Sequence, residues 1–207
     1  MSQSVPSKPI RLHTTALSGH GHRVQLFLSL LGLPVEIVPV DLFAGEQRTP
    51  AFLALNPFGQ VPVIEDDGVV LSDSNAILVY LAKRYGDASW LPGDPAGAAE
   101  VQRWLSLAAG PIMYGPCRAR LVTRFGAPYD LADAQATAVR LFELLDPQLA
   151  GKTFAVGATP TIADVAGYSY IAHAPEGGVS LEPYPNLRAW LARIEALPGF
   201  VALPAQA

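Results

Sequence analysis

Residues 10–40 predict a strand, a helix and a second strand. Residues 10–13 form a short apolar run typical of a buried strand. From residue 20 onward the apolar positions recur at helical intervals, and Gly32 supplies a stop after Val24, Phe27, Leu28 and Leu31. Residues 35–40 predict the second strand. A β-α-β unit of this length implies a parallel pair of strands with a right-handed crossover.

Residues 41–86 predict two more strands and another long helix. Gly45 and Pro50 interrupt residues 41–52, which favours an irregular loop containing a short helix. Residues 62–65 and 69–71 then predict a hairpin closed by an Asp-Gly turn. The helix that follows has a buried stripe made of Ile77, Leu78, Leu81 and Tyr85, and we expect it to stop at Gly86.

The rest of the chain predicts helices only. Glycine and proline gather in residues 86–95, so we expect one domain at residues 1–85, a linker at 86–96 and a second domain at 97–207. An aspartate and a proline at residues 94 and 95 favour a helix start, and Pro111 and Pro116 should kink or break that helix. Further helices are expected at about residues 130–149, after a capping box at Thr161–Asp164, and around Leu187, Trp190, Leu191 and Ile194.

Composition and charge limit the function classes. With 207 residues, of which 50% are hydrophobic, the chain should fold compactly, and a net charge of −4 disfavours nucleic acids and anionic membranes as partners. Cys117 is the only cysteine, which predicts a reducing compartment without a disulfide framework. Residues 1–8 lack an apolar signal stretch, so we expect a cytoplasmic location. His20 and His22 make a poor metal site and are more simply read as a solvated first helical turn, so no metal is expected.

Residues 56–74 are the most informative segment of the chain. They read as a proline-containing loop, the hairpin, and a helix whose first turn carries Ser72, Asp73 and Ser74. Such residues commonly do no more than cap a helix. Side by side at a helix N-terminus, however, an anion and hydrogen-bond donors can also hold a group that carries both an ammonium and a carboxylate.

This layout resembles the glutathione-binding half of the cytosolic glutathione transferases. Pro62 matches the cis-proline of that family, and Asp73 with Ser74 matches its acidic-serine pair at the start of the third helix. The second half is similar too, since the family appends an all-helical domain with a comparable capping box. The resemblance implies a thioredoxin-like α/β domain followed by an all-α domain. It also implies a second-substrate site against the helices, where Trp104, Met113, Tyr114 and Arg118 surround the proline kinks.

The resemblance also assigns binding residues for glutathione, which would be a co-substrate. Asp73 and Ser74 would hold the γ-glutamyl end, and the main chain of Val61 would pair with the cysteinyl unit. Gln47 and Gln60 would donate to the glycyl carboxylate, with Arg48 as a charged substitute for them.

The loop between the first strand and the first helix should stabilise the glutathione thiolate. One hydrogen bond to the charged sulfur, worth roughly 1.5–3 kcal/mol, would lower the thiol pKa by about one to two units. The first tyrosine is Tyr80, which excludes the tyrosine-type classes of the family, and Cys117 lies far from the loop. We therefore expect a hydroxyl-type enzyme similar to the theta and zeta classes. Ser18 is the favoured catalytic residue, and Thr14 and Thr15 are the alternatives.

Three functions follow from this interpretation. The leading one is a glutathione S-transferase that conjugates glutathione to a small electrophile. The alternatives are a glutathione-dependent disulfide reductase or peroxidase, and a non-catalytic binding module with the same fold. A homodimer is implied by the family, and the electrophile cannot be read from the chain.

Overall fold

The computed structural model of the protein describes residues 5–204, which form two compact units. The first unit comprises residues 5–88 together with 198–204, and the second comprises residues 89–197. The predicted division into a domain at residues 1–85, a linker at 86–96 and a second domain at 97–207 stays a prediction. Residues 1–4 and 205–207, which the predicted domains include, lie outside the described residues.

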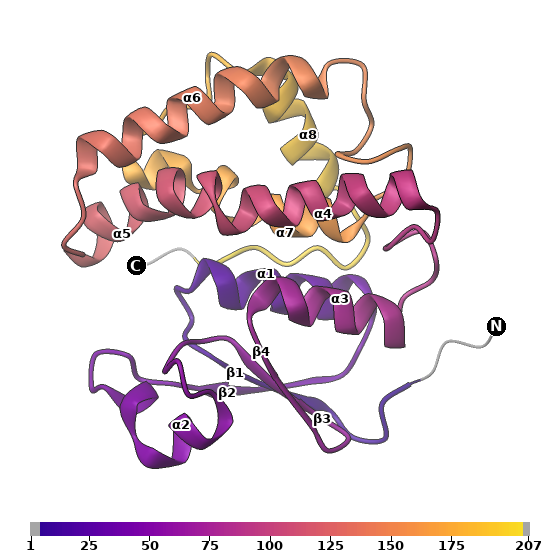
Figure 1. The fold of residues 1–207 in the computed structure, drawn as a ribbon, viewed down its shortest axis with the longest axis vertical. Helices are drawn as coiled ribbons and strands as arrows, with labels where there is room; N and C mark the ends of the chain where they lie inside the picture. The colour runs from indigo at the N-terminus through magenta and orange to yellow at the C-terminus, as the bar shows by residue number, and fades with distance from the viewer. Residues whose placement is uncertain (1–4, 205–207) are drawn as a thin grey trace. The chain divides into compact units, whose positions relative to one another are not determined.

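The first unit is built on a four-stranded mixed sheet with the strand order β2-β1-β3-β4. Strand β1 (Ile10–Thr14) runs parallel to β2 (Val35–Pro39) and antiparallel to β3 (Val63–Asp66), which in turn pairs antiparallel with β4 (Val69–Ser72). Helices α1 (Gly19–Leu30) and α3 (Ser74–Arg84) pack together on one face of the sheet (Figure 1). The predicted β-α-β unit and the hairpin are therefore confirmed.

Helix α2 (Pro50–Leu55) covers the opposite face of the sheet. Its Phe52 packs with Val40 and Val63 in a separate apolar cluster. The prediction of an irregular loop containing a short helix at residues 41–52 is confirmed, and the short helix begins at Pro50. Thr49 caps this helix by accepting a hydrogen bond from the Phe52 N–H, and a proline at the first helical position loses no intrahelical bond.

The C-terminal residues of the described chain return to α1. The Nε2 atom of His22 lies 2.8 Å from the carbonyl oxygen of Val201, and Gly199 lies so close to Ser29 that a Cβ would come within 2.8 Å of the Ser29 carbonyl. His22 is only 2% exposed. The interpretation of both histidines as a solvated turn was therefore wrong for His22, which anchors a distant segment of the chain.

The second unit contains only helical elements among its described residues. The α-helices are α4 (Pro95–Ala109), α5 (Arg118–Phe125), α6 (Leu131–Leu149), α7 (Ile162–Ala172) and α8 (Pro185–Glu195). Short elements η1 (Glu46–Arg48, in the first unit), η2 (Met113–Cys117) and η3 (Ala174–Gly177) complete the structure. The predicted break after α4 is confirmed, because Pro116 lies in the π-helical turn η2. Helix α5 and η3 were not predicted.

Helix α7 begins with the predicted capping box. Thr161 accepts from a backbone N–H inside the helix, and Asp164 accepts from the Thr161 N–H at 2.9 Å. The Asp164 carboxylate also accepts from the indole of Trp190 at 2.7 Å, so the cap fastens α8 to α7. None of the helices within residues 5–204 combines the length and the apolar character that a bilayer-spanning helix requires.

Candidate active site

The loop before β3 is shaped by one buried asparagine. The side-chain nitrogen of Asn56 donates to the carbonyl oxygen of Gln60 at 2.8 Å, and its side-chain oxygen accepts from the Phe58 N–H at 3.1 Å. Gly59 completes the turn with a φ of 61°, which a residue without a Cβ adopts easily. The Val61–Pro62 peptide bond is cis. These contacts fix the main chain of Gln60 and Val61 beside the first residue of β3.

Asp73 joins β4 to α3 in an unusual backbone conformation. Its φ is 70°, which is uncommon for a residue with a Cβ, and its carboxylate caps α3 by accepting from the Ala76 N–H at 2.9 Å. The side chain of Asp73 is exposed. A positive φ of this kind costs on the order of 1–3 kcal/mol and is found mainly where function requires it.

Ser74 is buried against two side chains of α1. Its hydroxyl oxygen accepts from Nη1 of Arg23 at 2.8 Å and lies 3.4 Å from Nδ1 of His20. Arg23 is 1% exposed, and its Nη1 also lies 3.1 Å from the side-chain oxygen of Asn75. A buried guanidinium therefore stands directly behind the serine of the acidic-serine pair.

His20 is held in its neutral form by the same arrangement. Desolvation and the charge of Arg23 lower the pKa of His20 from 6.5 to about 3. Nη1 of Arg23 lies 3.3 Å from Nδ1 of His20, and because a guanidinium can only donate, this nitrogen accepts. The proton of the neutral ring is then on Nε2. His20 consequently cannot contribute the partial positive charge that would stabilise a thiolate at neutral pH.

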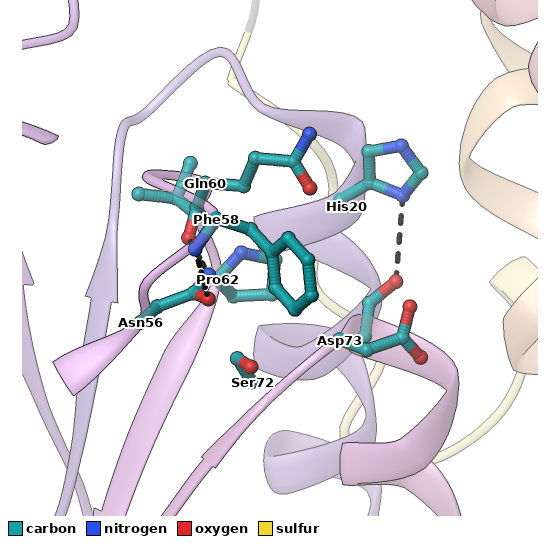
Figure 2. A pocket seen from close by; sticks show the side chains of 9 residues that line it. His20, Asn56, Phe58, Gln60, Pro62, Ser72 and Asp73 are labelled. Atoms are coloured by element: carbon teal, nitrogen blue, oxygen red, sulfur yellow. Dashed lines mark hydrogen bonds between the residues drawn. The ribbon is translucent and has the colours of Figure 1, made fainter. Parts of the chain in front are cut away.

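These segments enclose a cavity of about 340 Å³ in the first unit. Figure 2 shows Phe58, Gln60 and Pro62 on one side of the cavity, with His20 and Asp73 facing them from the other. The cavity brings together four of the predicted binding residues, which are Gln60, Val61, Asp73 and Ser74. The other five lining residues had not been assigned to glutathione binding, and they are His20, Asn56, Phe58, Pro62 and Ser72.

Ser18 is not among the residues that line this cavity. It is the N-cap of α1, where its hydroxyl oxygen accepts from the Gly21 N–H at 3.0 Å. Since the oxygen accepts in this bond, the hydroxyl hydrogen can still be donated to another group. Thr14 is 3% exposed, and its hydroxyl donates to the Thr15 carbonyl at 3.4 Å, so it is the less accessible alternative.

Gln47 also lies outside the set of lining residues. Its side-chain nitrogen lies 3.4 Å from the carbonyl oxygen of Leu42, and its side-chain oxygen is buried without a hydrogen-bond partner in the described structure. Arg48, the charged substitute, is exposed at the end of η1. The glycyl-carboxylate role of these residues stays a prediction.

The sequence carried uneven signals for the residues that were not predicted. Asn56 precedes Pro57, and an Asn-Pro pair is a turn signal that could have suggested its role. Arg23 gave no signal, because arginine side chains are mostly exposed in folded proteins. Within residues 5–204 no group of three or more His, Cys, Asp or Glu side chains is placed to hold a metal ion.

Comparisons with known proteins agree with this geometry. Residues 17–84 match the family profile of the glutathione S-transferase N-terminal domain, and residues 119–198 match that of the C-terminal domain. The chain is 34% identical to glutathione S-transferase 3 of Zea mays, over 93% of this chain and 91% of the relative.

Solved structures give the same result. A glutathione S-transferase from Pseudomonas fluorescens superposes with a TM-score of 0.89 at 31% identity, covering 95% of this chain and 99% of the other. A glutathione transferase homologue from Drosophila mojavensis, crystallised with bound glutathione, has a TM-score of 0.81 at 28% identity, covering 92% and 89%. The predicted thioredoxin-like α/β domain followed by helices is confirmed. The chain belongs to the glutathione S-transferase family.

Proposed function

We propose that this protein is a glutathione transferase that binds glutathione in the cavity of the first unit and conjugates it to a small electrophile. The observation that carries the proposal is the convergence of Asp73 and Ser74 with Gln60 and Val61 on one cavity, although the two pairs lie on different segments. Family membership supports it, because the family binds and conjugates glutathione. The neighbour from Drosophila mojavensis, which was crystallised with glutathione, gives further support.

The charges around Asp73 fit the γ-glutamyl end of glutathione. The exposed Asp73 carboxylate would pair with the ammonium. The N-terminal N–H groups of α3 and the Ser74 hydroxyl would receive the carboxylate, with the positive charge of Arg23 behind them. Val61 would pair through its main chain with the cysteinyl unit, and Gln60 would donate to the glycyl end. Gln47 would have to turn away from Leu42 before it could take part.

Ser18 would stabilise the thiolate of bound glutathione. A serine hydroxyl cannot act as a base at neutral pH, so its effect must be electrostatic, through donation to the sulfur at the N-terminus of the 12-residue helix α1. Because one such hydrogen bond is worth roughly 1.5–3 kcal/mol, Ser18→Ala should raise the pKa of bound glutathione by about one to two units. Glutathione affinity should change little.

The test is the thiolate absorbance of the glutathione complex as a function of pH. Thr14→Val and Thr15→Val are the matched controls, and both should leave the pKa of the bound thiol close to that of the wild-type complex. A shift in a threonine variant would move the catalytic assignment to that residue. A shift in none of the three would leave the N–H groups of α1 as the activating element.

Activity screening would separate transferase from reductase. We expect conjugation with aryl halides to exceed reduction of glutathione mixed disulfides or peroxides, because the only cysteine, Cys117, is fully buried. A protein without either activity that still bound glutathione would be a binding module. The homodimer implied by the resemblance and the cytoplasmic location expected from residues 1–8 both stay predictions.

A further inference from the structure

Asn56 ties the loop before β3 to the end of α2. It directly follows α2 and is only 3% exposed. Its main-chain N–H donates to the Phe52 carbonyl at 2.9 Å, and its carbonyl oxygen accepts from the Gly59 N–H at 2.9 Å. Its side chain adds the bonds to the Gln60 carbonyl and from the Phe58 N–H (Figure 2). One buried residue therefore makes four hydrogen bonds, three of them to the loop.

A side-chain amide suits this position because it donates and accepts at the same time. The Gln60 carbonyl can only accept and the Phe58 N–H can only donate, so the two partners fix which way the amide points. An ionised carboxylate of the same size can only accept. Asn56→Asp would therefore keep the bond from Phe58 but place an oxygen against the oxygen of Gln60. Protonation of the new carboxyl group would restore the donor.

The same loop forms one wall of the cavity and rests on a second support. Its residues Phe58, Gln60 and Val61 line the cavity. At Gly59, where φ is 61°, a Cβ would lie 3.0 Å from the main-chain oxygen of Gln47, so the backbone of the loop packs closely against η1. The loop is thus held from η1 by packing and from α2 by the buried amide.

The opposite wall of the cavity is fixed without Asn56. Asp73 is held by its bond from the Ala76 N–H, and Ser74 is held by the guanidinium of Arg23. In the proposed binding mode this wall receives the γ-glutamyl end of glutathione, while the loop receives the cysteinyl and glycyl units. Loss of the Asn56 amide should therefore release only the wall that contacts the cysteinyl and glycyl units.

We infer that Asn56 is a positioning residue for glutathione, because its amide holds the main chain of Gln60 and Val61 in the orientation that pairs with the cysteinyl unit. This inference rests on the proposed binding of glutathione in this cavity. Both polar atoms of the amide have main-chain partners, so Asn56 acts through the loop rather than on the reacting sulfur. A released loop would hold the binding orientation for only a fraction of the time, and the apparent dissociation constant rises by the inverse of that fraction.

Calorimetric titration with glutathione at pH 8 and pH 5 provides the first test. At pH 8 Asn56→Asp should bind about tenfold more weakly than the wild-type protein, the change that corresponds to one main-chain carbonyl left without its donor. Burial and the facing carbonyl oxygen raise the pKa of the new carboxyl group, so it should be protonated at pH 5 and the two affinities should become similar. Asn56→Ala cannot regain a donor and should show the same loss at both pH values. His20 and Asp73 are the other titratable side chains of the cavity lining, and wild-type protein titrated in parallel corrects for them.

Gln135→Glu is the matched control. The side-chain nitrogen of Gln135 donates to the Gly177 carbonyl at 2.9 Å in the second unit, so this substitution also places a carboxylate against a main-chain carbonyl. We expect it to keep wild-type affinity for glutathione at both pH values. Denaturant unfolding at each pH would establish that each variant is folded. Asn56→Ala is the deciding variant if Asn56→Asp is unfolded at pH 8.

Turnover with 1-chloro-2,4-dinitrobenzene provides the second test. Saturating glutathione fills the site even when the loop is released, so at pH 8 Asn56→Asp should raise the KM for glutathione about tenfold and leave kcat nearly unchanged. A residue that acted on the sulfur would lower kcat instead.

The outcomes separate the inference from the proposed function. Wild-type affinity in folded Asn56→Asp at pH 8, or a loss that persists unchanged at pH 5, would overturn the positioning role of Asn56. A lower kcat at unchanged KM would overturn it too. A wild-type protein that bound no glutathione would refute the proposed function together with the inference. A protein that bound glutathione without conjugating it would refute only the transferase function, and the titrations would still decide the role of Asn56.

Discussion

Asp73 offers the sharpest test of glutathione binding, because its carboxylate has two separable roles. It caps α3 through the Ala76 N–H, and in our proposal it also pairs with the ammonium of glutathione. Asparagine keeps the first role and loses the second, since it is as good an N-cap as aspartate and also tolerates a positive φ. Alanine loses both. Comparing Asp73→Asn with Asp73→Ala therefore distinguishes the cap from the charge.

The structure sets different magnitudes for stability and affinity. Loss of the cap costs about 1 kcal/mol, and a φ of 70° costs alanine on the order of another 1 kcal/mol, so Asp73→Ala should destabilise the fold by about 2 kcal/mol. Asp73→Asn should be nearly neutral. A charge-assisted hydrogen bond is worth roughly 1.5–3 kcal/mol, and because Asp73 is exposed the lower end applies. Both variants should bind glutathione about tenfold more weakly.

Denaturant unfolding and calorimetric titration with glutathione measure the two quantities separately. We expect Asp73→Ala and Asp73→Asn to lose the same affinity for glutathione, and only Asp73→Ala to lose stability. Wild-type affinity in Asp73→Asn would refute the ammonium contact and leave Asp73 as a cap alone.

Two other residues give predictions of a different kind. Cys117→Ala should keep conjugation and any disulfide reduction, because the thiol is fully buried in η2. A selective loss of disulfide reduction, with glutathione binding intact, would instead identify a protein thiol as the reductant. His20→Gln should reduce the acid sensitivity of the fold. Between pH 6.5 and about 3 the unfolded chain protonates this ring and the folded chain does not, so wild-type stability should fall by up to about 1.4 kcal/mol per pH unit as the pH drops. Denaturation curves at pH 7 and pH 4.5 would test this, and an equal fall in both proteins would contradict a His20 ring that stays neutral in the folded protein.

Local patterns predicted the elements well because each depends on neighbouring residues. The apolar stripe of α3, the hairpin turn and the capping box of α7 are all properties of short windows of sequence. The short helix expected within residues 41–52 is α2, and its first residue depends on Thr49, which caps it. The residue at which a short helix of this kind begins is set by a single capping hydrogen bond.

The site was less predictable because it depends on contacts between distant segments. Asp73, Ser74, Gln60 and Val61 were found only through a family resemblance. Local sequence did not predict that Ser74 would meet Arg23, 51 positions earlier, because that contact requires α1 and α3 to pack on the same face of the sheet. Such a contact follows from the topology and leaves no periodic trace in the chain.

The packing of α1 against α3 also gives the cavity its polarity. Arg23 places a buried positive charge behind Ser74, and Asp73 places a negative charge at the exposed side of the same turn. His20, which would otherwise add a second positive charge, is kept neutral by the first. The result is one cation from α1 and one anion at the N-cap of α3, which lie beside the adjacent residues Ser74 and Asp73 and complement a ligand whose ammonium and carboxylate share one carbon atom. Removing Arg23 would therefore have two opposing effects, because the carboxylate would lose its positive neighbour while His20, 3.4 Å from the Ser74 hydroxyl, would more readily take up a proton and carry a positive charge in its place.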